Sequence, residues 1–303
     1  MTRPDTAATA VAEQKIPAPA AVLLGAPLVP RVRRPRSLLV YLSYGWLVLV
    51  IGLAVLANVL PVPSYTIPVG DPRQGPGGGL DLLLGTDSQG RPMIARAVYG
   101  AQVSLLVGTI GGLLGAVIGA LLGLLAGYLG GWVDWIVRLV ADALLAFPPL
   151  LLLLAISSIL TPSITTLTAG LTLLIIPTFT RIARANTLAW ASRDFITAAR
   201  NMGASRRRIL VREILPNLLP SLAAYLPIVI SALIVAEGSL SFLGQGIPPP
   251  RPSWGGMISE GKDYLVDAPH MVLVPALIIF FTVFALNQVG DHLRQRFDRT
   301  LHD

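Results

Sequence analysis

Few side chains in this sequence could do covalent or metal chemistry, and those present lie far apart. The 303 residues contain no cysteine, which excludes a disulfide, a thiolate metal site and a cysteine nucleophile. The three histidines, His270, His292 and His302, lack the spacing of metal ligands. Ser239 and Ser241 have no nearby histidine to act as a general base. The sequence therefore predicts no catalytic residue and no metal ligand.

The remaining acids allow ion pairing or contact with a ligand. Asp134, Arg138 and Asp142 recur at intervals of four, so they share one face of a helix and can neutralise one another. An ion-pair ladder is the favoured interpretation, and a role in transport is the alternative. Glu237 follows a long apolar run, where it could line a substrate path or cap the next helix. These two roles stay open.

The elements that must position these residues are membrane helices. Hydrophobic residues make up 53% of the chain and charged residues 13%, against about 25% charged in soluble domains. Several apolar blocks are long enough to cross a hydrocarbon core of about 30 Å. We predict an all-α polytopic membrane protein with no chain of acids and histidines through its spans, as a proton-coupled carrier would need. The six predicted transmembrane helices are 38–60, 103–126, 139–160, 164–179, 218–236 and 271–290.

Two of these spans carry further local signals. Phe147-Pro148-Pro149 removes two backbone donors and should kink or interrupt the third span. In the second span a glycine recurs every fourth residue from Gly111 to Gly127, which allows another helix to approach closely. Packing within the chain is favoured for this stripe, and contact with another membrane subunit is the alternative.

The distribution of positive charge predicts the orientation. Of the 23 Lys and Arg residues, 18 fall before the first span, after the last, or in the loops that follow spans two and four. The positive-inside rule places these segments, and both termini, in the cytoplasm. Residues 1–37 then form a cytoplasmic tail, largely disordered, and residues 38–102 the first span with an outer loop. Residues 103–290 form the core with a cytoplasmic loop at 181–216, and residues 291–303 a cytoplasmic C-terminal tail.

Residues 195–216 combine a short amphipathic helix with three consecutive arginines, Arg206, Arg207 and Arg208. Asp194 is a candidate N-cap and Gly203 a candidate left-handed C-terminal residue. Ile196, Ala199 and Met202 would share one face and give a rigid projection with a small apolar tip. An arginine run by itself indicates a solvated cytoplasmic face. Beside such a projection, docking of a soluble partner is the better interpretation.

This loop resembles the EAA loop of bacterial ABC-transporter permeases. Ala198, Ala199, Gly203, Leu215 and Pro216 fall at the positions of that pattern, whereas Thr197 replaces its first glutamate and Glu213 its isoleucine. The resemblance implies the type I ABC importer permease fold and a coupling helix that inserts into a cytoplasmic ATPase. The implied ATPase-coupling residues are Phe195, Ile196, Thr197, Ala198, Ala199, Met202, Gly203, Arg206, Arg207, Arg208, Leu215 and Pro216.

Three further segments, 84–91, 99–105 and 240–255, resemble the C-type permeases of the dipeptide, oligopeptide and nickel importers. Pro92 and Gln102 depart from that pattern where it usually has aspartate and arginine. The resemblance implies a second homologous permease subunit, two ABC ATPase domains and an extracytoplasmic substrate-binding protein. This subunit would lie in the bacterial cytoplasmic membrane and would bind no cofactor and no nucleic acid. It would not be an enzyme, because the partner subunits would bind ATP-Mg and hydrolyse ATP.

The outer segment 239–254 has two possible roles. Phe242 and Trp254 supply apolar anchors, and Glu237 a partner for an ammonium group, so these three residues could contact substrate or binding protein. Alternatively, the segment is a plug over the outer mouth. The predicted function is ATP-driven import of dipeptides, oligopeptides or related small ligands. The alternative is a stand-alone channel or secondary carrier, in which the basic loop serves topology alone.

Overall fold

The computed structural model describes residues 38–300, and side chains as far as residue 297. The predicted disorder of residues 1–37 therefore lies outside the described residues. Within this range the regular structure is helical, apart from one isolated bridge between Thr86 and Pro92. The elements are α1 (Leu38–Leu56), α2 (Met93–Leu129), α3 (Gly131–Ala146), α4 (Pro149–Ile159), α5 (Ile164–Ala191), α6 (Asp194–Asn201), α7 (Arg206–Arg208), the π-helix η2 (Ile209–Ile214), α8 (Leu215–Phe242), α9 (Trp254–Gly261), the 3-10 helix η3 (Lys262–Tyr264) and α10 (His270–Thr300).

Five of these elements are long and apolar enough to cross a membrane: α1, α2, α5, α8 with α7 and η2, and α10. A sixth span results if α3 and α4 are counted as one, so the predicted number agrees. The two helices are bent by 88° at Phe147 and Pro148, which confirms the predicted interruption. Both residues are extended because a residue that precedes proline disfavours the helical region.

Three helices extend beyond the spans that were predicted from the apolar runs. Helix α2 starts ten residues before the predicted Val103 and includes Arg96. Helix α5 continues twelve residues past Phe179, through two arginines. Helix α10 runs to Thr300, so the segment predicted as a C-terminal tail begins inside a helix. The arginines within α2 and α5 are held by carboxylates of neighbouring segments.

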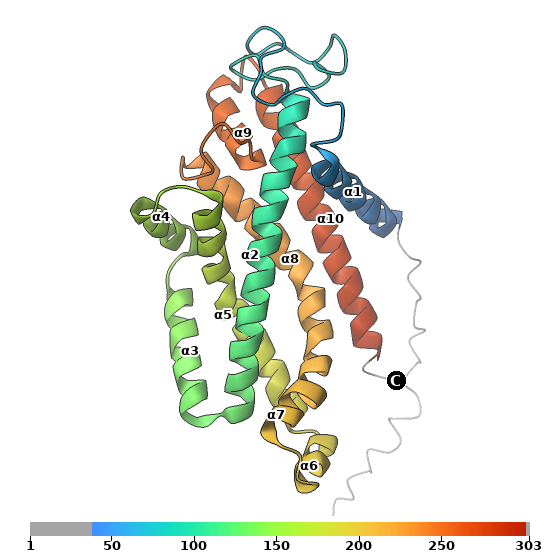
Figure 1. The fold of residues 1–303 in the computed structure, drawn as a ribbon, viewed down its shortest axis with the longest axis vertical. Helices are drawn as coiled ribbons and strands as arrows, with labels where there is room; N and C mark the ends of the chain where they lie inside the picture. The colour runs from blue at the N-terminus through green and yellow to red at the C-terminus, as the bar shows by residue number, and fades with distance from the viewer. Residues whose placement is uncertain (1–37, 301–303) are drawn as a thin grey trace, which may run out of the picture. The chain divides into compact units, whose positions relative to one another are not determined.

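The glycine stripe of α2 packs within the chain, as the favoured interpretation held. Added Cβ atoms at Gly115, Gly119, Gly123 and Gly127 would collide with residues of α5, at Gly119 and Gly123 with its backbone. Gly111 has ordinary contacts with both α5 and α8. In Figure 1, α2 lies along α5 and crosses α8. Small residues thus bring α2 and α5 into backbone contact, the arrangement expected of small-xxx-small faces.

The acids of α3 pair mainly with α5 and only partly along their own helix. Asp134 binds the Arg184 guanidinium through both oxygens, one of them at 2.8 Å, and Arg138 lies 3.3 Å from the same carboxylate. Asp142 accepts a hydrogen bond from Arg181 at 2.6 Å. The structural role is supported, but the predicted ladder within one helix is corrected, because the Asp142 carboxylate pairs with α5.

Candidate functional site

The two ends of the bundle differ in character, and each holds predicted site residues. Helices α6 and α7 lie at one end, called here the α6 end (Figure 1). Helix α9 and the loop before α2 lie at the opposite end, called here the α9 end. The residues predicted for ATPase coupling lie at the α6 end.

Helix α6 is a single short helix whose boundaries are set by local chemistry. Arg193 occupies the N-cap position and Asp194 the first helical position, so the predicted N-cap was one residue too late. Asp194 still places its negative charge in the first turn, where it interacts favourably with the positive end of the helix dipole. Gly203 has φ +82° directly after the C-cap residue, which confirms the predicted left-handed termination. The Ser205 hydroxyl then accepts a bond from the Arg208 N–H and caps α7.

The predicted apolar face of α6 is divided between the interior and solvent. Ile196 is fully buried in one cluster with Ile209 and Ile214 of η2, so it anchors α6 and does not form the tip. Ala199 is half-buried. Met202 is 81% exposed and Phe195 41% exposed. The expectation that Ile196, Ala199 and Met202 share one exposed face is therefore corrected.

The exposed residues of this loop, which the sequence predicts to dock a partner, are called here the docking surface. Beside Phe195 and Met202 it contains Thr197 and Ala198, both exposed. Arg206, Arg207 and Arg208 are exposed on α7, and within residues 38–297 none of them has an ion-pair partner. Leu215 is half-buried and Pro216 exposed in the first turn of α8. The surface thus joins a small apolar tip to a cluster of free positive charge.

At the α9 end, Glu237 lies in the interior and has no exposed area. Its carboxylate accepts hydrogen bonds from Ser104 of α2 at 3.1 Å and from Ser241 at 2.8 Å. Ser104 in turn accepts from the Trp254 backbone N–H at 3.2 Å. Glu237 therefore ties α8 to α2 and to the start of α9. In this conformation it cannot meet a ligand at the surface.

Trp254 is also buried, which corrects its expected place as an exposed anchor. Its indole N–H donates to the Ala97 carbonyl at 3.0 Å, inside the cluster that contains Met93 and Met257. Phe242 is 46% exposed, and the Lys262 ammonium lies 5.2 Å from its ring centroid. Of the three predicted contact residues, Phe242 alone is accessible here.

A buried charge cluster at the α9 end was not singled out from the sequence. Asp87 binds both Arg91, at 2.6 Å, and Arg96. Glu260 of α9 binds the same two arginines at 3.2 and 2.8 Å. Burial raises the pKa of Glu260 to about 7, against the opposing effect of Arg91. Asp87 and Arg91 lie in one turn, where the Asp87 carboxylate also accepts from the Arg91 backbone N–H, whereas Glu260 reaches them only through the packing of α9.

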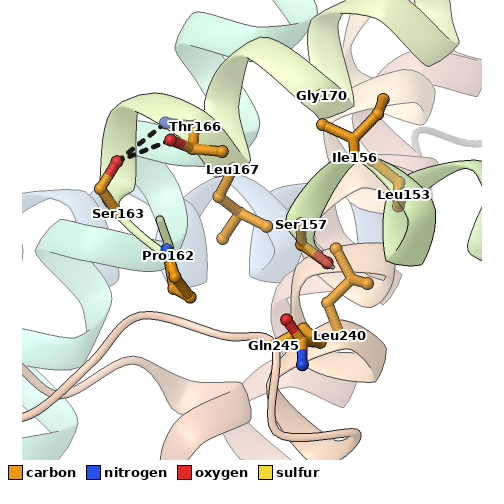
Figure 2. A pocket seen from close by; sticks show the side chains of 10 residues that line it. All are labelled: Leu153, Ile156, Ser157, Pro162, Ser163, Thr166, Leu167, Gly170, Leu240 and Gln245. Atoms are coloured by element: carbon orange, nitrogen blue, oxygen red, sulfur yellow. Dashed lines mark hydrogen bonds between the residues drawn. The ribbon is translucent and has the colours of Figure 1, made fainter. Parts of the chain in front are cut away.

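Available space also differs between the ends. Figure 2 shows a small pocket where α4 and the loop before α5 approach Leu240 and Gln245. Its volume of about 10 Å³ is at the lower limit for one water molecule. A cavity of about 550 Å³ lies among α5, α8 and α10, toward the α6 end. Its lining includes Asn186, Asn217 and Arg294.

The chain is similar in sequence to two curated transport proteins. A putative peptide transport system permease protein of Brucella suis biovar 1 (strain 1330) is 43% identical over 223 residues, which are 74% of this chain and 75% of that protein. The glutathione transport system permease protein GsiD of Escherichia coli O6:H1 (strain CFT073) is 43% identical over 222 residues, 73% of each chain.

The fold is that of a solved ABC importer permease. A chain of the MetNI methionine ABC transporter in an inward-facing conformation superposes with a TM-score of 0.57 at 20% identity, over 68% of this chain and 98% of that one. The expected type I permease fold is thereby confirmed. Residues 119–302 match the family model described as "Binding-protein-dependent transport system inner membrane component". This chain belongs to that family of inner membrane components.

Proposed function

We propose that this permease subunit imports short peptides and is driven by ATPase subunits that bind its docking surface. The exposed tip beside three unpaired arginines carries this proposal. An apolar tip supplies contact energy on docking, and the arginines favour an acidic rim on the partner. Relatives named for peptide and glutathione transport support a peptide substrate. A stand-alone channel or carrier is not favoured, because these relatives are permease subunits of transport systems.

The anchoring of α6 suggests how docking reaches the membrane. Ile196 packs with η2, and η2 continues directly into α8. A force on the docking surface would therefore act on α8, whose far end holds Glu237. Binding energy that differs between two conformations would then shift their populations. π-Helical turns often occur at functional sites, which fits the place of η2 in this connection.

The proposal also includes the other subunits of the transporter and the orientation of this chain in the membrane. A second permease subunit completes the membrane part, and an extracytoplasmic binding protein delivers the substrate to the α9 end. ATP and Mg²⁺ act on the ATPase subunits. The α6 end faces the cytoplasm of a bacterium, as do both termini, because the Lys and Arg residues gather there. A reporter after Asp303 should signal from the cytoplasm and one inserted at Gly77 from outside.

The decisive experiment alters the exposed tip without disturbing the fold. Met202→Asp and Ala198→Asp should insert and melt as wild type does, yet lose co-purification of the ATPases and peptide uptake. Val266→Asp is the matched control for co-purification of the ATPases, since Val266 is 93% exposed at the opposite, α9 end. Retention of the ATPases at the wild-type level by both tip variants would refute the docking surface. Loss in the control as well would indicate a general assembly defect.

A further inference from the structure

The cavity near the α6 end has the size and chemistry of a ligand site. Its volume of about 550 Å³ falls within the 300–1,000 Å³ or so that is usual for small-molecule sites. Three helices contribute to its wall: α5 through Asn186, α8 through Asn217, Ser221 and Tyr225, and α10 through Arg294. Nothing in the sequence pattern singled out these residues, because they come together only through packing.

The two asparagines present acceptors to a ligand. The Asn186 amide nitrogen donates to the Ile182 carbonyl at 2.9 Å, one turn earlier in the same helix. The Asn217 amide nitrogen donates to the Glu213 carbonyl at 2.6 Å in the same manner. Each amide nitrogen thus has one of its two N–H donors engaged by its own helix, and each side-chain carbonyl oxygen is available to accept a bond. Backbone N–H groups of a peptide are suitable donors.

The only charge among the described lining residues is positive. Arg294 is exposed, and no ion pair holds it among the described side chains, which end at residue 297. A guanidinium binds a carboxylate with two parallel hydrogen bonds. No described lining residue is acidic, so an ammonium group would find no counter-charge. Tyr225 adds an apolar wall, its ring held at 5.9 Å from that of Phe179.

We propose that this cavity binds the C-terminal carboxylate of a short peptide through Arg294, while Asn186 and Asn217 accept hydrogen bonds from its backbone N–H groups. The inference rests on the proposed function and adds a recognition site to it. Specificity would then require a free C-terminus and would be indifferent to the N-terminus. The pocket of about 10 Å³ beside α4 offers no comparable space.

The test uses the assembled transporter in lipid nanodiscs, without nucleotide or binding protein. The probe is a tripeptide, alanine–photoleucine–alanine, and labelling of the α8 segment around Tyr225 is measured by mass spectrometry. The half-saturating concentration should rise about tenfold when the probe is C-terminally amidated, and N-acetylation should leave it unchanged. Arg294→Gln should raise it by a similar factor for the free acid, and the amidated probe should be insensitive to that substitution.

Arg296→Gln is the matched control, because Arg296 is exposed on the same helix and does not line the cavity. Equal labelling by the free acid and the amide would overturn the proposal, as would labelling confined to another segment. Uptake into proteoliposomes that contain the ATPases and the binding protein distinguishes failure of this site from failure of the proposed function. Normal uptake without dependence on the carboxylate refutes this site alone, whereas no uptake of any peptide refutes the proposed substrate class.

Discussion

The Ser104 hydroxyl donates a hydrogen bond to the Glu237 carboxylate at 3.1 Å, although the two residues lie 133 positions apart in the chain. This bond joins α2 to α8 in the interior of the α9 end. The Ser241 hydroxyl, one turn further along α8, donates a second hydrogen bond to the same carboxylate. The Ser104 hydroxyl accepts from the Trp254 N–H, so it also fixes the start of α9. The α9 end is thus closed by a polar network that an apolar core encloses.

Glu237→Ala should destabilise the protein by about 1–3 kcal/mol, because it leaves two buried hydroxyl groups without their acceptor. Glu237→Gln retains an amide oxygen and should lose less. The measurement is thermal unfolding of the purified protein in detergent, followed by limited proteolysis at residues 244–253. A Glu237→Ala variant that unfolds at the wild-type temperature would contradict the role assigned to this network.

A second prediction concerns pH at the α9 end. The pKa of Glu260 is raised from its ordinary value of 4.5 to about 7, chiefly by burial, so the folded protein holds this proton more tightly than the unfolded chain. The resulting stabilisation is complete below about pH 4.5 and is lost as the pH rises through 7. The unfolding temperature should therefore fall between pH 5 and pH 8.

Glu260→Gln should flatten this dependence, since an amide does not titrate. Asp263→Asn, in the neighbouring η3, is the control and should keep the wild-type slope. An unchanged slope in Glu260→Gln would show that another group causes it.

A third prediction concerns the close contact of α2 with α5. Gly123→Ala should destabilise the protein by about 1–3 kcal/mol, because the added methyl group would collide with the Thr180 carbonyl oxygen and the Ala183 side chain. Gly52→Ala in α1 is the control, since its Cβ would meet nothing within 4 Å. This control should be neutral or slightly stabilising, because alanine is the better helix former. Equal unfolding temperatures for the two variants would contradict the packing argument.

The sequence predicted the features that local chemistry determines. The break at Pro148, the glycine stripe and the left-handed Gly203 all follow from backbone constraints on single residues. The predicted ends of helices did not match the structure where the helices contain arginines. Arg181 and Arg184 lie inside α5 because carboxylates of α3 reach them, and such a pairing is not encoded in either segment alone.

The position of the exposed 195–216 loop could be predicted from the sequence, but its packing could not. The loop is polar and lies between two apolar blocks. Burial of Ile196 depends on the return of the chain through η2, and burial of Trp254 depends on the distant Ala97. The cavity with Arg294 requires three helices that are far apart in sequence. Both burials and the cavity depend on packing between segments that are far apart in the chain, so composition and spacing could not predict them.

The last prediction separates conformation from contact on the docking surface. Gly203 has φ +82°, and an added Cβ would meet nothing within 4 Å. A substitution there is therefore opposed by backbone strain and not by collision. Asparagine adopts left-handed backbone geometry more readily than other residues, whereas a β-branched residue resists it. Gly203→Asn should retain ATPase binding and uptake, and Gly203→Val should lose a large part of both.

Co-purification of the ATPases and peptide uptake are measured for the two variants side by side, together with unfolding temperature. Strain of about 1–2 kcal/mol at one turn should reposition α7 relative to α6 without unfolding the transmembrane helices. The unfolding temperatures of both variants should therefore stay near that of the wild type. If valine is tolerated as well as asparagine, the left-handed turn does not set the docking geometry, and the coupling role must rest on Met202 and the arginines alone.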